Sequence, residues 1–324
     1  MAAAVAVIIP YFQREPGILA RAVRSILQQK ACARPHIIVV DDESPVSAES
    51  ELGEFRADIK STITVIRQPN RGPSVARNVG LDAVPPDIDW IALLDSDDIW
   101  EPDHLATALT ALEQGYDLFF ADHKRDGLHK THFELASFNP PKSHAVDSLS
   151  SVYDFPEDLF TTALNHSPIG MSTVVMRRSR LGLVRFADDL HLCEDLLYSL
   201  ELARASKRVA VGHNVQVTYG KGLNMSAVAW DSPSAVTGTL NFSRYCAEVR
   251  RRFQLTPQQQ AILRLKERAN RQTFVRTVLS LVRRGKKCDL STIGHFMLRN
   301  PRTCFDLFQV LGMEVARRTA GGRP

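Results

Sequence analysis

The sequence has few of the features that mark a secreted or membrane-spanning protein. Its 324 residues include only five cysteines, an odd number, widely spaced and without a C-x-x-C pair, so they indicate reduced thiols. No apolar run approaches the roughly 20 residues that a transmembrane helix needs. The apolar N-terminus has no basic segment of the kind that opens a signal peptide. We therefore expect a cytoplasmic protein that meets a membrane only at its surface.

Two glycine-rich phosphate-binding motifs are also absent. No G-x-G-x-x-G follows the first apolar run, and no G-x-x-x-x-G-K occurs in the sequence. These absences exclude a dinucleotide-binding fingerprint and a P-loop. Any nucleotide must be bound in another way.

The charges are distributed unevenly. From Arg244 onward there are 18 Lys or Arg and 5 Asp or Glu, a net charge of +13, whereas the preceding residues have a net charge of −9. Such asymmetry indicates that the two parts meet different partners. We predict one large domain over residues 1–230 and a basic helical region over residues 231–324.

The first half alternates between apolar runs and helical patterns. Fully apolar strands separated by amphipathic helices predict an α/β fold, with a mostly parallel sheet flanked by helices. Ligands bind such sheets at the carboxyl ends of the strands. The predicted strands cover residues 5–9, 36–40, 62–66, 90–94 and 117–121, and the predicted helices cover 18–27, 74–81 and 105–112.

Three carboxylates follow the fourth predicted strand within four positions, at Asp95, Asp97 and Asp98. Crowded like charges are unfavourable unless a cation binds them, and hard divalent metals prefer carboxylate oxygens. A solvated acidic turn is the simpler alternative. Because Pro10 and Asp42 also follow strands, we expect them at the same edge of the sheet.

Five segments, in order over roughly the first 230 residues, resemble the family 2 glycosyltransferases, which have the GT-A fold. They are IIPYFQ at 8–13, VVDDES at 39–44, NRGPSVARNVG at 70–80, LDSDD at 94–98 and ED at 194–195. The resemblance implies transfer of a sugar from a UDP-sugar to a hydroxyl, with inversion at the anomeric carbon. The segment at residues 165–173 resembles the acceptor side of that family.

The resemblance also implies a donor site that contains Mg²⁺ or Mn²⁺. Its nucleotide-binding residues map to Pro10, Phe12, Asp42, Arg77 and Asp95, and its metal ligands map to Asp97 and Asp98. It does not separate the metal ligand from the ribose contact within the acidic cluster. Each residue also has an ordinary structural interpretation: Phe12 as core, Asp42 as a turn residue and Arg77 as a solvent-facing helix cation.

Asp195 resembles the catalytic base of the family, which takes the proton of the acceptor hydroxyl. Glu194 and Asp195 also suit a helix start, where acids are favoured, and both interpretations can hold. Many relatives have a histidine in a Tyr-Arg-x-His element, but residues 219–222 here read YGKG. Lys221 could neutralise the diphosphate instead, and His213 is either a third metal ligand or a structural residue.

The Q-x-x-R-W element of processive synthases is absent, which favours single addition. Residues 9–19, IPYFQREPGIL, resemble the opening of glucosyltransferases that build succinoglycan-type exopolysaccharide repeats. UDP-glucose is therefore the expected donor, and a polyprenyl-diphosphate-linked saccharide is the expected acceptor. The remaining alternatives are a nucleotidyltransferase and a non-catalytic, membrane-associated scaffold with a vestigial nucleotide pocket.

Amphipathic basic helices in the C-terminal region suit the anionic inner face of the cytoplasmic membrane. The alternatives are packing on the catalytic domain and formation of a homodimer. The basic residues are not accompanied by a helix-turn-helix, zinc-ligand or RNP-type pattern, so we do not expect a nucleic-acid partner.

Overall fold

A computed structural model describes residues 4–30, 35–140, 145–146, 149–190, 192–220, 232–286 and 289–306. The contacts divide the chain into two units. The first contains residues 1–189 and 198–223, and the second contains residues 190–197 and 224–324. Residues 190–197 lie within the predicted 1–230 domain and group with the C-terminal helices in the second unit.

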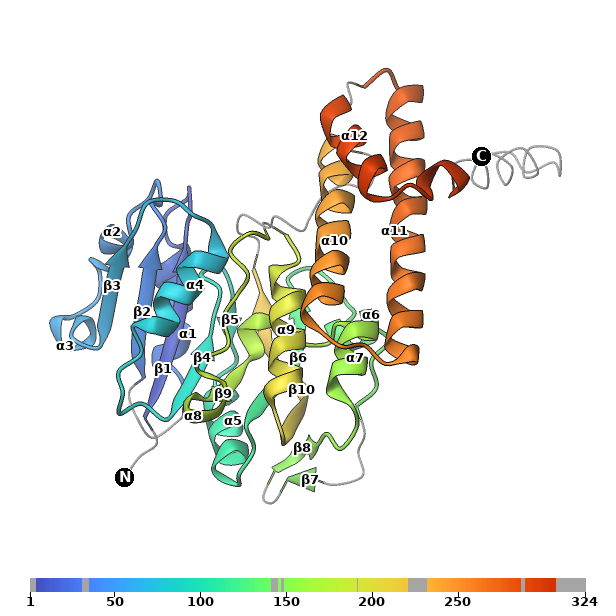
Figure 1. The fold of residues 1–324 in the computed structure, drawn as a ribbon. Helices are drawn as coiled ribbons and strands as arrows, with labels where there is room; N and C mark the ends of the chain where they lie inside the picture. Colours follow the sequence, from blue (N-terminus) through green and yellow to red (C-terminus); the bar gives the residue numbers. More distant parts are fainter. Residues whose placement is uncertain are drawn as a thin grey trace. The chain divides into compact units, whose positions relative to one another are not determined.

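The first unit is built on one mixed sheet (Figure 1). Its order is β3 (Ile63–Arg67), β2 (His36–Asp41), β1 (Val5–Tyr11), β4 (Trp90–Leu93), β9 (Val175–Arg177), β6 (Leu118–Arg125), β10 (Val209–Tyr219), β8 (Leu149–Asp154) and β7 (Ala145–Val146), and β5 (Ile99–Trp100) pairs with β10. Strands β3, β2, β1 and β4 run parallel, as do β6 and β10. Strand β9 lies antiparallel between β4 and β6. The predicted α/β class with a mostly parallel core is confirmed.

Helices separate these strands along the chain. The longer ones are α1 (Ile18–Leu27), α4 (Pro73–Asp82), α5 (His104–Glu113), α7 (Leu159–His166) and α9 (Glu194–Ala205). The short ones are α2 (Ala48–Leu52), α3 (Ala57–Lys60), α6 (His132–Leu135), α8 (Arg178–Leu181) and the 3₁₀ turn η1 (Met171–Thr173). The three predicted helices correspond to α1, α4 and α5, because each has an apolar stripe at helical spacing.

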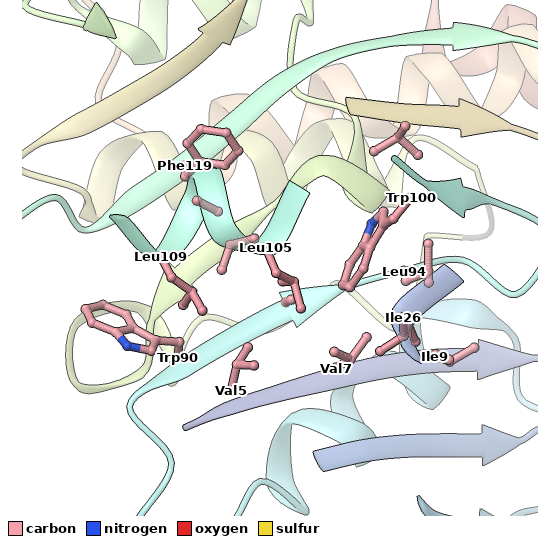
Figure 2. Packing of buried hydrophobic residues seen from close by; sticks show 14 of the residues in the cluster. Val5, Val7, Ile9, Ile26, Trp90, Leu94, Trp100, Leu105, Leu109 and Phe119 are labelled. Atoms are coloured by element: carbon pink, nitrogen blue, oxygen red, sulfur yellow. The ribbon is translucent and has the colours of Figure 1, made fainter. Parts of the chain in front are cut away.

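The two faces of the sheet have separate apolar cores because successive strand residues point to opposite sides. Val5, Val7 and Ile9 of β1 pack with α1 and α5 on one face, and Figure 2 shows them beside Ile26, Leu105 and Leu109. Ala6 and Ile8 of the same strand belong to the other core, with Ala76 of α4 and Leu202 of α9. Burial on both faces explains why β1 is apolar throughout.

Two close contacts fix helices against the sheet. A Cβ atom at Gly80 of α4 would lie 2.4 Å from Cγ2 of Ile8, so this helix approaches β1 more closely than a side chain allows. The first turn of α1 has no acidic residue of its own. Instead, the buried Glu51 of α2 accepts a hydrogen bond from Gly17 N–H at 2.6 Å. A carboxylate from another element thereby satisfies a free donor at the start of α1.

The second unit contains α10 (Pro233–Arg252), α11 (Pro257–Arg283) and α12 (Leu290–Arg299), as well as the first turn of α9. Its core includes Val236 and Leu240 of α10, Phe274 of α11 and Phe296 of α12. The rings of Phe274 and Phe296 stack with centroids 3.8 Å apart. Within the described ranges, none of the helices has both the length and the apolar character required to cross a bilayer.

Candidate active site

The carboxyl ends of β1, β2 and β4 meet at one edge of the sheet, and Gln13 connects the loops that follow them. Its backbone N–H donates to Ser44 Oγ at 2.8 Å, and its side-chain amide donates to Ser96 Oγ at 3.1 Å. Ser44 follows β2, and Ser96 lies in the acidic turn after β4. This buried glutamine therefore holds three predicted motifs together.

Asp98 is the buried member of the acidic turn, with 3% exposure. Ser172 Oγ donates a hydrogen bond to its Oδ2 atom at 2.5 Å, and Gly220 N–H donates to Oδ1 at 3.0 Å. Burial, followed by the charges of Asp95 and Asp97, raises the pKa of Asp98 well above its ordinary value of 3.8. Both oxygens of the predicted metal ligand Asp98 are thus used to hold the turn.

Gly220 lies directly against this turn. A Cβ atom at this position would be 1.9 Å from the carbonyl oxygen of Asp97, so only glycine permits the approach. Its neighbour Tyr219 stacks on His123 at 3.9 Å, and His123 stacks on His132 at 4.2 Å. Burial, together with the nearby His132 and Arg125, lowers the pKa of His123 to about 2. An aromatic stack with a neutral His123 at its centre therefore backs the end of β10.

Arg77 contacts the first carboxylate of the turn. Its Nη2 lies 2.6 Å from Oδ1 of Asp95, and the arginine is only 6% exposed. Its guanidinium also lies 5.1 Å from the ring centroid of Phe186. The structure thus shows Arg77 paired with Asp95, and its predicted place near a diphosphate stays a prediction.

Phe186 continues this arrangement towards α9. Asn78 clamps the phenylalanine backbone, since its amide donates to Phe186 O at 3.0 Å and accepts from Phe186 N–H at 2.9 Å. The Phe186 ring stacks on Tyr198 at 3.7 Å with an interplanar angle of 9°. Asp95, Arg77, Phe186 and Tyr198 therefore form one continuous set of contacts.

Asp42 organises the loop that precedes α4. Its Oδ1 accepts hydrogen bonds from Gln68 Nε2 at 2.7 Å and Arg71 N–H at 2.9 Å, and its Oδ2 accepts from Gly72 N–H at 2.8 Å. A carboxylate has about four acceptor positions, so roughly one remains. The turn interpretation of Asp42 therefore describes these contacts well.

Pro10 and Phe12 lie at the end of β1. Both are partly exposed, whereas the intervening Tyr11 and the following Gln13 are buried. The alternation places the two predicted nucleotide contacts on one side of the chain. Phe12 is therefore only partly core.

Glu194 and Asp195 form the start of α9 and belong to the second unit. Glu194 is buried, with 8% exposure, whereas Asp195 is exposed. Oδ1 of Asp195 accepts a hydrogen bond from Leu196 N–H at 2.8 Å. Of the two carboxylates, Asp195 is the one that solvent and small molecules can reach.

Of the two remaining candidates, His213 lies in the described part of the chain and does not join the acidic turn. The His213 ring packs against Tyr153 of β8 in a tilted arrangement, with centroids 4.6 Å apart and an interplanar angle of 52°. Its neighbour Gly212 pairs with Ala121 and Tyr219 pairs with Arg125, a separation of roughly 13 Å along β6 at 3.3 Å per residue. The structural interpretation of His213 therefore fits best. Lys221 lies outside the described residues.

The acidic turn suits a metal that arrives with a phosphorylated substrate. Across the described ranges, no three carboxylate, imidazole or thiol groups converge as a preassembled metal site. Asp95 and Asp97 are both partly exposed and supply hard oxygen donors. Because Mg²⁺ is commonly bound by one or two carboxylates together with substrate phosphates, these residues fit such a metal.

Several supporting residues were not assigned these roles from the sequence. Ser172 and Asn78 lay within quoted motifs, but no local pattern showed that one donates to Asp98 or that the other clamps Phe186. No sequence motif indicated a role for Phe186. Gly220 lies in the YGKG segment, where the sequence analysis assigned meaning to the missing histidine and to Lys221 but not to the glycine.

Known proteins share this sequence pattern. The family model described as glycosyl transferase family 2 matches residues 6–180. The succinoglycan biosynthesis protein ExoW of Rhizobium meliloti (strain 1021) is 34% identical over 302 residues, covering 91% of this chain and 94% of ExoW. The minor teichoic acid biosynthesis protein GgaA of Bacillus subtilis (strain 168) is 33% identical over 243 residues, which cover 72% of this chain and 52% of GgaA.

Solved structures share the fold at low sequence identity. S. aureus TarS 1–349 in complex with UDP-GlcNAc has a TM-score of 0.56 and 16% identity, covering 94% of this chain and 81% of that one. The mannosyltransferase PcManGT from Pyrobaculum calidifontis, in complex with GDP-Man and Mn²⁺, has a TM-score of 0.54 and 16% identity. That match covers 98% of this chain and 87% of PcManGT.

The mixed sheet and the acidic turn at its carboxyl edge define a glycosyltransferase of the GT-A type. The chain belongs to glycosyl transferase family 2, as the family match and the similarity to ExoW show.

Proposed function

We propose that the protein transfers a sugar from a UDP-sugar, with glucose the expected sugar, to a hydroxyl of a lipid-linked oligosaccharide. The reaction inverts the anomeric carbon and serves exopolysaccharide or cell-surface polysaccharide biosynthesis at the inner face of the cytoplasmic membrane. The similarity to ExoW supports the pathway, and the UDP-GlcNAc complex of TarS supports a UDP-linked donor. The observation that carries the proposal is the acidic turn. Ser172 and Gly220 hold it through Asp98, and Asp95 and Asp97 stay partly exposed.

In the proposed mechanism, the acidic turn holds the donor. Asp97 and Asp95 would bind Mg²⁺ or Mn²⁺, which when bound supplies positive charge to the leaving diphosphate. Arg77 positions Asp95 through its 2.6 Å contact, and Asp98 fixes the turn through Ser172 and Gly220. Pro10, Phe12 and the remaining acceptor position of Asp42 suit contacts to the base and ribose.

Asp195 is the proposed general base. It takes the proton of the acceptor hydroxyl as that oxygen attacks the anomeric carbon, and the carbon–diphosphate oxygen bond breaks. Its exposure suits contact with an acceptor hydroxyl. The neighbouring Glu194 is buried and suits a structural role.

Calorimetric titration with UDP, GDP and ADP, each with Mn²⁺ and with EDTA, tests the donor site. We expect metal-dependent binding that is tightest for UDP. Preference for another nucleotide would contradict the UDP assignment. Absence of binding to all three would contradict a sugar-nucleotide site.

The variant Asp195→Asn tests the base. We expect kcat for transfer from UDP-glucose to fall by a factor of roughly 10² to 10⁴, the usual contribution of a general base, with UDP affinity unchanged. Glu194→Gln makes the same chemical change at the adjacent buried carboxylate and should retain most of the activity. Equal losses in the two variants would contradict the assignment.

A further inference from the structure

Exposed apolar side chains gather in the last part of the second unit that the structure describes. Five of the nine large hydrophobic residues that are exposed in the described ranges lie between residues 282 and 305. Leu290 is 79% exposed, Leu298 82% and Phe305 64%. The other two are Val282, at 63%, and Met297, at 36%. We call these five residues the α12 surface.

Helix α12 has one apolar face packed and another left open. Phe296 is fully buried and stacks on Phe274 of α11. Leu290, Met297 and Leu298 are separated by seven and eight positions, so they share a different side of the helix. Since the packed side already supplies the core contact, the exposed side is not needed to hold the unit together.

Polar contacts hold α12 and its C-terminal extension in place. Asn300 Nδ2 donates to Ser243 Oγ of α10 at 3.2 Å. Arg271 of α11 forms an ion pair with the buried Asp306. Phe305 lies between these two contacts, so its exposed side chain belongs to a segment that is held in place on both sides. Figure 1 shows α12 lying beside α10 and α11 within this helical unit.

Cations surround the exposed apolar residues. The exposed cations at and just after the end of α11 are Arg283, Arg284 and Lys286. Arg299 and Arg302, at the other end of α12, are exposed as well. The sequence from 282 to 306 contains six Lys or Arg and two acids, and one of those acids is Asp306, which is paired with Arg271. A rigid apolar helix face flanked by cations is typical of helices that lie in the surface of an anionic bilayer.

We propose that the α12 surface docks on an anionic lipid bilayer, with its leucines and Phe305 among the lipid headgroups and its arginines on the lipid phosphates. The inference rests on the proposed function, which needs the enzyme at a membrane, and it names the contact surface. Long cationic side chains can reach the phosphates while the apolar residues enter the interface. A second copy of the chain is a poorer occupant, because it would bring two cationic surfaces together.

Sedimentation of the full-length protein with lipid vesicles tests the proposal. One set of vesicles contains phosphatidylcholine, and the other contains equal parts of phosphatidylcholine and phosphatidylglycerol. We expect wild-type protein to partition onto the anionic vesicles. The double variant Leu290→Asp/Leu298→Asp should lower the partition coefficient at least about tenfold, given the apolar burial that it removes.

Leu183→Asp is the matched control, because Leu183 is 89% exposed and belongs to the first unit. It should bind vesicles like wild type. Replacing Arg299 and Arg302 with glutamine should weaken binding to anionic vesicles several-fold per residue. Light scattering without vesicles tests whether a second copy of the chain occupies the surface instead. If Leu290→Asp/Leu298→Asp turned a dimer into a monomer, the surface would be a self-association site and the lipid proposal would be overturned.

The proposal would also be overturned if the double variant bound anionic vesicles as well as wild type does. It would be overturned equally if wild-type protein did not bind these vesicles. Calorimetric UDP titration of the double variant, without vesicles, keeps the two proposals separate. Normal UDP binding with lost vesicle binding supports the docking surface. If wild-type protein bound vesicles but did not bind UDP, the docking surface would be supported and the proposed donor site would be refuted.

Discussion

His104 allows a quantitative test of the core beside the acidic turn. Its side chain is fully buried between Trp100 and Phe119, with ring centroids 4.8 Å and 6.0 Å away. Neither ring nitrogen has a hydrogen-bond partner in the described part of the chain. Burial lowers the pKa of His104 from 6.5 to about 3. The folded protein therefore holds this ring neutral above about pH 3.

The lowered pKa makes stability depend on pH. Below about pH 6.5 the unfolded chain binds a proton at His104 that the folded chain does not, so acid favours unfolding until about pH 3. The free energy of unfolding should change by up to about 1.4 kcal/mol per pH unit over this range. Between about pH 7 and about pH 5, His104 alone therefore removes about 2 kcal/mol.

The variant His104→Leu should lose about 2 kcal/mol less than wild type over the same pH interval. It should also be about 1 kcal/mol more stable near neutral pH, because it removes two unsatisfied buried polar atoms. Urea unfolding followed by tryptophan fluorescence reports on this core, which contains Trp90 and Trp100. His129→Leu, at an exposed imidazole, should retain the wild-type pH dependence. Parallel acid losses in His104→Leu and wild type would refute the reasoning.

Two further predictions concern close backbone approaches. Gly220→Ala would place a methyl group 1.9 Å from the carbonyl oxygen of Asp97. We therefore expect this variant to lose metal-dependent UDP binding, measured by calorimetry. If its UDP affinity equalled that of wild type, the turn would not need this contact. Gly80→Ala should destabilise the protein by about 2 kcal/mol through its clash with β1, measured as the free energy of unfolding in urea. The control Gly238→Ala, in α10 with nothing within 4 Å, should stabilise by about 0.5–1 kcal/mol, and a similar loss in both would contradict the packing argument.

The parallel half of the fold was predictable because its strands are buried on both faces. The predicted strands at 5–9, 36–40, 62–66 and 90–94 match β1, β2, β3 and β4 to within about two residues at each end. Strand β6 was predicted to end at residue 121 but extends to Arg125. It continues through the buried polar residues Asp122 and His123 because β10 pairs with them. Polar strand residues that are buried by a distant partner leave no local pattern.

The site was predictable at the level of positions but not of contacts. The sequence located the carboxylates, because crowded charges are visible in a short window. It did not show that Ser172 supports Asp98 or that Gly220 packs on the turn, since these contacts join residues 74 and 122 positions apart. The Arg77 to Asp95 ion pair spans 18 positions and likewise has no local signature. Motifs identify which residues take part, whereas their division of labour depends on tertiary contacts.

Because Gly220 lies late in the sequence, the acidic turn can be completed only after most of the first unit has been synthesised. During synthesis, β1 to β4 are complete once residue 93 has been added, but Gly220, whose N–H donates to Asp98 of the acidic turn, is added only after β10 ends at Tyr219. Pairing strands so distant in sequence is slow compared with forming the local βαβ units. A nascent chain that ends between residues 98 and 208 thus contains every acidic residue of the turn but lacks Gly220, which donates to Asp98. The complete acidic turn, and with it the proposed donor site, is therefore among the last parts of the first unit to form.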